Sequence, residues 1–98
     1  MKKIVLLCSM GMTTGLLVKK MKEEADKIGY QCEITAHSIT SLKAIYEDAD
    51  IILLGPQVRY QENTLKENVS CPVEIIDMAA YGMVDGKKVL ANVQKLIG

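Results

Sequence analysis

The stretch that decides the fold of this chain is Ile4-Val5-Leu6-Leu7-Cys8-Ser9-Met10-Gly11-Met12-Thr13-Thr14-Gly15. Its first part, 4–7, is a continuous apolar run, which is typical of a strand buried on both faces of a parallel sheet. The run ends at a cysteine, and small and hydroxyl-bearing residues follow before a helical pattern begins. The stretch therefore predicts a strand, a tight loop and the N-terminus of a helix.

A strand, a tight loop and a helix N-terminus together form a common anion-binding arrangement. The unpaired N–H groups of the loop and the first helical turn converge, and the helix dipole adds positive potential. A thiol in this place should form the nucleophilic thiolate readily, and the same donors hold a phosphoryl group attached to it. We therefore interpret Cys8 as a phosphate-accepting nucleophile. The alternative is a strand-end cysteine that packs as a small hydrophobic residue, and the loop composition after Cys8 argues against it.

The rest of the chain alternates between helical and strand patterns. Helices are predicted over 14–28, 38–48, 58–69 and the single turn 78–82, with a last helix that Asp85 caps. Strands are predicted over 31–37, 50–54 and 73–76. The first helix is expected to use Thr13 or Thr14 as its cap and to end at Gly29. Its apolar residues at helical spacing are Leu16, Leu17, Val18, Met21, Ala25 and Ile28.

Strands that alternate with helices predict an α/β fold with a four-stranded parallel sheet and helices on both faces. We expect strand order 2-1-3-4, as in flavodoxin-like folds. The switch point then lies between the first and third strands, where ligands bind beyond the carboxyl ends. The Cys8 loop and Gly55-Pro56-Gln57 would form the two walls of that crevice. The length predicts a single domain, 1–98.

Composition excludes several classes of function. Twelve basic and twelve acidic residues cancel, so no basic surface for nucleic acid or an acidic membrane is expected. The apolar segment near the N-terminus is too short for a signal peptide, and no segment approaches transmembrane length, so we expect a cytoplasmic protein without membrane insertion. The three cysteines contain no C-x-x-C pair, which indicates neither a disulfide framework nor a zinc site. No metal or other cofactor is expected.

Three further residues with reactive side chains have simpler interpretations. Cys32, in an alternating strand pattern with Ile34 and Ala36, is expected to face the core. Cys71 begins a strand and should lie at the sheet edge opposite Cys8. His37 ends a strand at the same edge as Cys8, where it is either a proton carrier or a polar strand-end residue.

The sequence decides between several kinds of phosphate chemistry. A nucleotide P-loop needs G-x-x-x-x-G-K-[ST], and the stretch Gly11 to Gly15 contains no lysine. A receiver-type phosphoacceptor needs an aspartate at the end of the third strand, where this chain has Gly55. Cysteine-dependent phosphatases follow C-x-x-x-x-x-R, and Thr14 stands at the arginine position. Without that arginine, water lacks an obvious promoter for attack on a phosphocysteine, so a slowly hydrolysing carrier is favoured.

The chain resembles the enzyme IIB component of the bacterial phosphoenolpyruvate-dependent sugar phosphotransferase system (PTS), of the lactose/cellobiose/chitobiose class. The matching segments are Leu7-Cys8-Ser9-x-Gly11-Met12-Thr13-Thr14, Leu53-Leu54-Gly55-Pro56-Gln57, Val73-Glu74-Ile75-Ile76-Asp77 and Tyr81-Gly82-x-Val84-Asp85-Gly86. The resemblance implies a cytoplasmic phosphotransferase that takes phosphate from the histidine of enzyme IIA. It then passes the phosphate to a sugar of the β-glucoside or disaccharide type held by the membrane permease, enzyme IIC.

The resemblance also implies roles for individual residues. Cys8 is the phosphocysteine by position, and Gln57 and Tyr60 are candidates for the rim of the site. Met10 departs from the small residue expected there, and it and Met12 fit either a docking surface or inward packing. The phosphate loop is implied to consist of Ser9, Met10, Gly11, Met12, Thr13, Thr14 and Gly15.

Two other functions compete with the carrier. One is a small cysteine-dependent phosphatase or an arsenate-reductase-like enzyme, which would hydrolyse a chromogenic phosphate ester. The other is a flavodoxin-like binding module, which would carry flavin absorbance. The chain has four tyrosines but no tryptophan or phenylalanine, so it offers few aromatic walls for a flavin.

Overall fold

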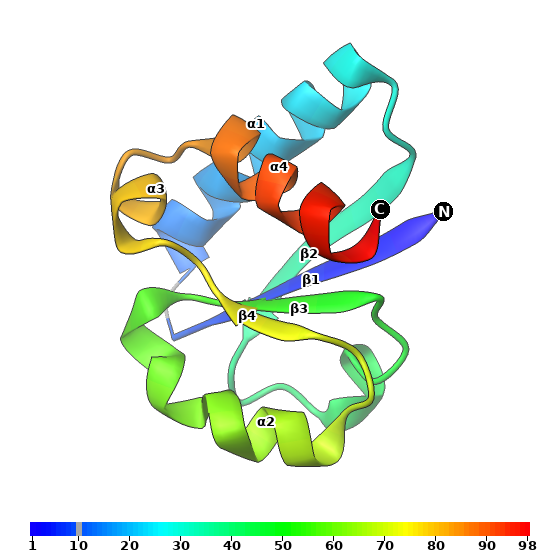
Figure 1. The fold of residues 1–98 in the computed structure, drawn as a ribbon. Helices are drawn as coiled ribbons and strands as arrows, with labels where there is room; N and C mark the ends of the chain where they lie inside the picture. The colour runs from blue at the N-terminus through cyan, green and yellow to red at the C-terminus, as the bar shows by residue number, and fades with distance from the viewer. Residues whose placement is uncertain (10) are drawn as a thin grey trace.

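The structure, a computed structural model, describes residues 1–9 and 11–98; the side chains at 11 and 12 are outside the description as well. Within these residues, four parallel strands form one sheet in the order β2-β1-β3-β4, as predicted. The strands are β1 (Lys2–Cys8), β2 (Cys32–Ser38), β3 (Ile51–Leu54) and β4 (Val73–Ile75). Because they run in the same direction, their carboxyl ends meet at one edge of the sheet (Figure 1).

Helical segments cover both faces of the sheet (Figure 1). One layer consists of α1 (Gly11–Ile28), α3 (Met78–Gly82) and α4 (Gly86–Ile97). The other consists of the 3-10 turns η1 (Lys43–Ile45) and η2 (Pro56–Gln61) and of α2 (Glu62–Asn68). A search of the described residues finds no helix with the length and apolar character needed to cross a membrane.

The central strand β1 contributes to two separate hydrophobic clusters. Ile4 and Leu6 pack against the α1 and α4 layer, and Val5 and Leu7 pack against the α2 layer. All four side chains are 0% exposed. The continuous apolar run is therefore explained by burial on both faces, as predicted for a central parallel strand.

The helix predicted over 38–48 is wrong. Of this segment only η1 is helical, and it is a short 3-10 turn. The Ser38 hydroxyl accepts a hydrogen bond from the Thr40 N–H at 3.2 Å, and such local bonds compete with helix formation. Tyr46 is buried, but Leu42 is 76% exposed and Ile45 38% exposed, so no apolar face holds a helix on the sheet.

The helix predicted over 58–69 is shorter than expected. The α-helical part is α2, Glu62–Asn68, and the preceding η2 bends at Val58, whose φ of −116° and ψ of 20° are not helical. Val58 and Leu65 are the buried anchors of this segment. Two anchors suffice for a short amphipathic helix but do not specify a continuous one.

Helix α1 begins at Gly11 rather than near Thr14, so the expected capping role of Thr13 or Thr14 is wrong. Its buried face is narrower than predicted. Leu17, Val18, Met21 and Ala25 are buried, whereas Leu16 and Ile28 are 53% and 48% exposed. The predicted core face of β2 is also incomplete, since Ile34 is buried but Cys32 is half-buried and Ala36 exposed. Both differences arise at the margins of the layers, where β2 is an edge strand.

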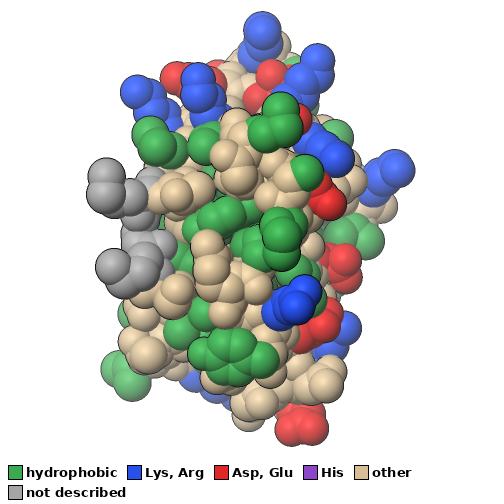
Figure 2. Space-filling model, turned by 90° about the vertical axis from the view of Figure 1, so that its left-hand side faces the viewer, with side chains coloured by type: hydrophobic (Ala, Val, Ile, Leu, Met, Phe, Trp, Pro, Cys, Tyr) green, Lys and Arg blue, Asp and Glu red, His purple; other side chains and the backbone are tan. Residues whose placement is uncertain are grey.

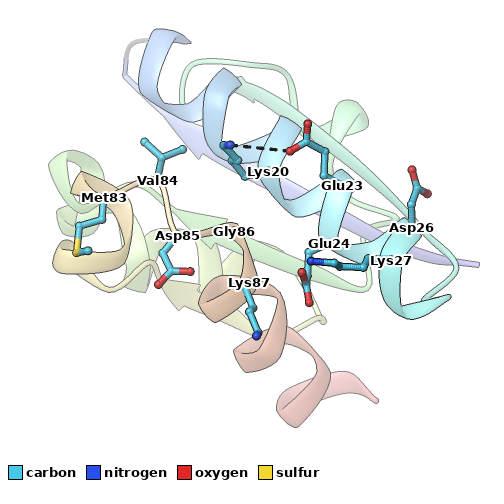
Figure 3. Close-up of a pocket in the computed structure, with 10 residues that line it drawn as sticks. All are labelled: Lys20, Glu23, Glu24, Asp26, Lys27, Met83, Val84, Asp85, Gly86 and Lys87. Carbon is cyan, nitrogen blue, oxygen red and sulfur yellow. Dashed lines mark ion pairs between the residues drawn. The ribbon is translucent and has the colours of Figure 1, made fainter.

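Helices α1 and α4 approach closely at Gly86. The Asp85 carboxylate accepts a hydrogen bond from the Lys88 N–H at 3.1 Å and caps α4, as predicted. A Cβ at Gly86 would lie 2.6 Å from the backbone carbonyl carbon of Lys20 and from the amide nitrogen of Met21. Gly86 and Lys20 both line a hollow beside this contact, between α1 and the start of α4 (Figure 3).

Replacing Gly86 by alanine should lower the free energy of unfolding by about 1–3 kcal/mol, because the added methyl group meets backbone of α1 that cannot rotate away. Thermal unfolding measures this, and each kcal/mol corresponds to about 4–8 °C in melting temperature for a domain of this size. Gly15→Ala is the matched control, since nothing lies within 4 Å of a Cβ at that position in α1. A Gly86→Ala variant as stable as Gly15→Ala would contradict the close packing of the two helices.

Candidate functional site

Cys8 is the last residue of β1 and is 3% exposed. The backbone around Cys8 is hydrogen-bonded on both sides, by the residue that follows β2 and by the residue that follows β3. The Ile39 N–H donates to the Cys8 carbonyl at 2.8 Å, and the Gly55 N–H donates to the Leu7 carbonyl at 2.9 Å. The alternation of side chains along β1 puts Cys8 on the same face as Ile4 and Leu6, toward α1. The thiol therefore lies between the sheet edge and the beginning of that helix.

A buried hydroxyl from α1 contacts the Cys8 thiol. The Thr14 hydroxyl, on a residue that is 1% exposed, donates a hydrogen bond to Cys8 Sγ at 2.9 Å. The same hydroxyl lies 3.0 Å from the hydroxyl of Tyr81 on α3, which is 7% exposed. Sequence analysis missed the contact of Thr14 with sulfur and noted Tyr81 only as part of the family motif. The signal available was that Tyr81 follows β4 and so returns to the edge where Cys8 lies.

The N-terminus of α1 stands directly after the strand end that carries Cys8. Helix α1 begins at Gly11, and N–H groups at the start of a helix lack an acceptor one turn earlier within the helix, which lets them bind an anion. Ser9 is exposed beside them. Gly15 lies inside α1, its φ is not positive, and no atom lies within 4 Å of the place where a Cβ would stand. Met10 and the docking or packing role of the Met12 side chain lie outside the described residues.

The two predicted walls of the crevice meet at Cys8. A Cβ built on Gly55 would lie 3.1 Å from Cys8 Cβ and 3.0 Å from Gln57 Oε1. Gly55 is therefore in contact with the nucleophile, and the Gln57 side chain reaches back over the same place. Tyr60 is 72% exposed on η2, and its assignment to the rim stays a prediction.

The other residues with reactive side chains are His37, Cys32 and Cys71, and His37 and Cys71 lie at the predicted edges of the sheet. In the pairing of β1 with β2, His37 stands opposite Leu7, so it is at the same edge as Cys8; its function stays untested. Burial raises the pKa of the Cys32 thiol. Burial also raises the pKa of the Cys71 thiol, and a backbone hydrogen bond lowers that pKa by a smaller amount. Cys71 precedes β4 and lies at the opposite edge. Among the described residues, no group of three or more His, Cys, Asp or Glu side chains is placed to hold a metal ion.

The surface around the site is apolar. Figure 2 shows the side of the molecule to which the carboxyl ends of the strands point. Hydrophobic side chains gather over its centre, and charged side chains lie mainly toward its margins. Elements at this edge carry exposed apolar residues, namely Tyr60 (72%), Met78 (65%) and Met83 (77%). This arrangement is typical of a protein-binding surface.

The hollow of Figure 3, about 740 Å³, lies along the second half of α1 and the start of α4, and Met83 borders it. Among the described residues, its lining includes neither Cys8 nor Ser9, Thr13 or Thr14. Side chains of both signs line it, and Lys20 and Glu23 pair with each other at 4.0 Å. The hollow is a solvated charged surface and not a continuation of the Cys8 site.

Comparison with known proteins identifies the family. The sequence model described as "PTS system, Lactose/Cellobiose specific IIB subunit" matches residues 3–92. The chain belongs to this IIB family. It is therefore a phosphotransferase component of a sugar phosphotransferase system.

Individual relatives agree with this assignment. The oligo-beta-mannoside-specific EIIB component of Bacillus subtilis is 48% identical to this chain over 90% of the chain and 88% of its own length. The galactose-specific EIIB component of Lactococcus lactis is 36% identical over 98% of this chain and 96% of its own. A lactose-specific IIB domain of Streptococcus pneumoniae superimposes with a TM-score of 0.86 over 99% and 98% of the two chains; at 20% identity this likeness shows the shared fold alone.

Helix α3, which carries Tyr81, is held by Asp77. The Asp77 carboxylate accepts a hydrogen bond from the Ala80 N–H at 3.0 Å and lies 3.6 Å from Lys88 Nζ. The hydrogen bond from the Ala80 N–H, followed by the charge of Lys88, lowers the pKa of Asp77 below its ordinary 3.8. A carboxylate with a lowered pKa stabilises the folded state above its ordinary pKa, and this contribution disappears as the pH falls through the lowered value.

Replacing Asp77 by alanine should therefore lower the melting temperature most at neutral pH. The difference from the unmodified protein should begin to shrink as the pH falls below about 3.8, where the unfolded chain takes up a proton, and should vanish below the lowered pKa of the folded state, where the carboxyl group is protonated in both states. Melting curves between about pH 2 and pH 7 measure this effect, because this pH range extends to both sides of the ordinary carboxyl pKa of about 4. A difference that is independent of pH would show that Asp77 does not act through its charge.

Proposed function

We propose that this protein is a phosphoryl carrier that takes phosphate from the phosphohistidine of enzyme IIA onto Cys8. It then donates the phosphate to a sugar bound at the permease, enzyme IIC. The observation that carries the proposal is the place of Cys8 at the carboxyl end of the central strand, directly before the N-terminus of the 18-residue helix α1. In this chain, which belongs to the IIB family, Cys8 combines a nucleophilic side chain with a neighbouring helix N-terminus that can bind an anion.

The phosphate-binding segment is proposed to be Ser9 to Thr14, acting chiefly through backbone N–H groups. The first helical turn supplies unpaired donors, and the helix dipole favours the negative phosphoryl group. Support comes from the start of α1 at Gly11, because these donors stand immediately beyond the Cys8 backbone. Gly15, which the family resemblance adds to the phosphate loop, lies inside α1, so the proposed segment ends at Thr14.

The apolar surface around Cys8 is proposed to bind both protein partners in turn. Met78 is the first residue of α3, Met83 follows its last residue, and both are among the exposed apolar residues at this edge. Methionine side chains adapt to differently shaped partners, which suits a carrier that must dock on IIA and then on IIC. The carrier is expected to work in the cytoplasm as one domain.

The acceptor sugar is proposed to be a β-linked disaccharide or oligosaccharide. The family description names lactose and cellobiose, and the Bacillus subtilis relative is named for oligo-beta-mannosides. The galactose-specific relative from Lactococcus lactis marks the alternative, a monosaccharide. Phosphotransfer to a permease preparation loaded with each sugar distinguishes them.

The competing phosphatase function is opposed by Thr14. This residue stands where a cysteine phosphatase has its arginine. It is 1% exposed, and its hydroxyl donates a hydrogen bond to the Cys8 sulfur. A neutral hydroxyl does not bind the equatorial oxygens of a phosphoryl group as a guanidinium does. The purified protein should accordingly turn over almost no chromogenic phosphate ester.

Given the phosphorylated IIA of its own system, the protein should gain one phosphoryl group, on Cys8, and keep it far longer alone than with a sugar-loaded permease. Cys8→Ser should abolish productive transfer, because a serine hydroxyl without a base is a poor nucleophile at neutral pH. Intact-mass spectrometry over a time course measures both.

Cys32→Ser and Cys71→Ser are the matched controls and should retain transfer. Burial raises the pKa of both thiols, and neither lies in the site. Phosphate on His37, or rapid loss of phosphate to water, would overturn the carrier proposal.

Gly55→Ala should slow phosphorylation of Cys8 by about 10-fold, because small displacements of reacting groups have large effects on rate. The added methyl group would lie 3.1 Å from Cys8 Cβ, so the nucleophile must shift. Gly82→Ala is the control, since nothing lies within 4 Å of a Cβ there. A Gly55→Ala variant that transfers phosphate at the normal rate would show that the Gly55 turn is not a wall of the site.

A further inference from the structure

Thr14 and Tyr81 form a buried line of hydroxyl groups that ends at the Cys8 sulfur. The Thr14 hydroxyl lies 2.9 Å from Cys8 Sγ and 3.0 Å from the Tyr81 hydroxyl. The three residues are 3%, 1% and 7% exposed, in the order Cys8, Thr14, Tyr81. They come from β1, α1 and α3, so the line connects three separate parts of the chain.

The direction of the hydrogen bonds follows from counting protons. A threonine hydroxyl has one hydrogen, and in this structure Thr14 donates it to sulfur. The contact between Thr14 and Tyr81 then requires the Tyr81 O–H to donate to Thr14 Oγ1. Two successive donors therefore point toward the sulfur, and each bond in such a chain polarises the next.

We propose that Thr14 and Tyr81 are positioning residues that orient Cys8 and stabilise negative charge on its sulfur during phosphoryl transfer. The proposal rests on the proposed carrier function. When IIA is the donor, a sulfur electron pair forms the S–P bond, the P–N bond breaks and the histidine nitrogen keeps the electron pair. When the sugar is the acceptor, its hydroxyl oxygen forms the new bond to phosphorus, the S–P bond breaks, the sulfur keeps the electron pair, and the hydroxyl proton passes to solvent.

The hydroxyl chain is matched to the charged state of the sulfur. In the first transfer the attacking sulfur is a thiolate, and in the second it leaves as a thiolate, whereas it has no charge of its own while bonded to phosphorus. A donor directed at sulfur therefore stabilises the thiolate as leaving group more than it stabilises the phosphocysteine. The clearest effect is thus expected on discharge of the phosphocysteine.

Thr14→Val removes the hydroxyl and keeps the shape. It should slow discharge to the sugar-loaded permease, and back to IIA, by about 10- to 100-fold, as expected for loss of a hydrogen bond to a charged group. The concentration of IIA at half-maximal rate should not change, because Thr14 is 1% exposed and offers a partner almost no surface to contact. Thr14→Ser should restore the rate, which a purely structural role of the threonine methyl group would not predict.

Tyr81→Phe should have a smaller effect, about 2- to 10-fold, because Thr14 still donates to sulfur. The chain offers matched controls in Thr35 and Tyr30. Their hydroxyl groups are buried and have no hydrogen-bond partner among the described residues. Thr35→Val and Tyr30→Phe, which make the same chemical changes away from Cys8, should leave the transfer rate unchanged.

A second measurement separates failure of this inference from failure of the proposed function. The ultraviolet absorbance of the Cys8 thiolate, and its rate of reaction with iodoacetamide, need no partner protein; both are measured in the Cys32→Ser, Cys71→Ser background. Thr14→Val should reduce the thiolate absorbance at neutral pH, and Thr14→Ser should not. If the unmodified protein accepts phosphate on Cys8 but Thr14→Val matches Thr35→Val in both measurements, the inference is wrong and the carrier function stands. If phosphorylated IIA transfers nothing to Cys8, the proposed function fails while the absorbance still tests the hydroxyl chain.

Discussion

The backbone at the end of β1 is bonded from both sides, and the rest of the site depends on this constraint. The Ile39 N–H binds the Cys8 carbonyl, and the Gly55 N–H binds the Leu7 carbonyl, at 2.8 and 2.9 Å. Because the strands on either side are parallel to β1, both bonds come from residues just beyond the carboxyl ends of those strands. The nucleophile thus has a fixed backbone, and side-chain alternation along β1 decides which layer its sulfur faces.

The parts of the fold that were predicted from sequence are those that local patterns specify. The continuous apolar runs of β1 and β3 predicted central strands, and the observed strand order is the one expected from flavodoxin-like folds. The helix prediction for 38–48 was wrong because three apolar residues at helical spacing do not show whether a surface is available to bury them. Of Leu42, Ile45 and Tyr46, only Tyr46 is buried. Secondary structure at the margins of a layer depends on the partners that the folded chain supplies.

The candidate site divides in the same way. Cys8 and Gly55 were predicted because each ends a recognisable strand, and strand ends of a parallel sheet must meet. The contact between Thr14 and Tyr81 joins residues 67 positions apart in the chain. No periodicity relates them, and Thr14 read in isolation looks like a helix cap. Burial supplies the missing reason, since a hydroxyl that is almost fully enclosed must find partners within the protein.

The enclosure of Thr14 also bears on the proposal that this protein carries phosphate rather than hydrolysing it. At the position where a cysteine phosphatase has arginine, this chain places a side chain that is 1% exposed and already in contact with both Cys8 and Tyr81. An arginine there would have to displace Tyr81 from α3 or leave a buried charge without an acceptor, and either is costly. Under the proposed carrier function, the Thr14 hydroxyl acts on the sulfur and not on the phosphoryl oxygens. A donor aimed at sulfur stabilises the departing thiolate whichever acceptor attacks phosphorus, whereas a guanidinium on the oxygens would further stabilise the transferring phosphoryl group for attack by any nucleophile, water included. Slow loss of phosphate to water is therefore attributed to the missing guanidinium and not to the direction of the Thr14 hydroxyl.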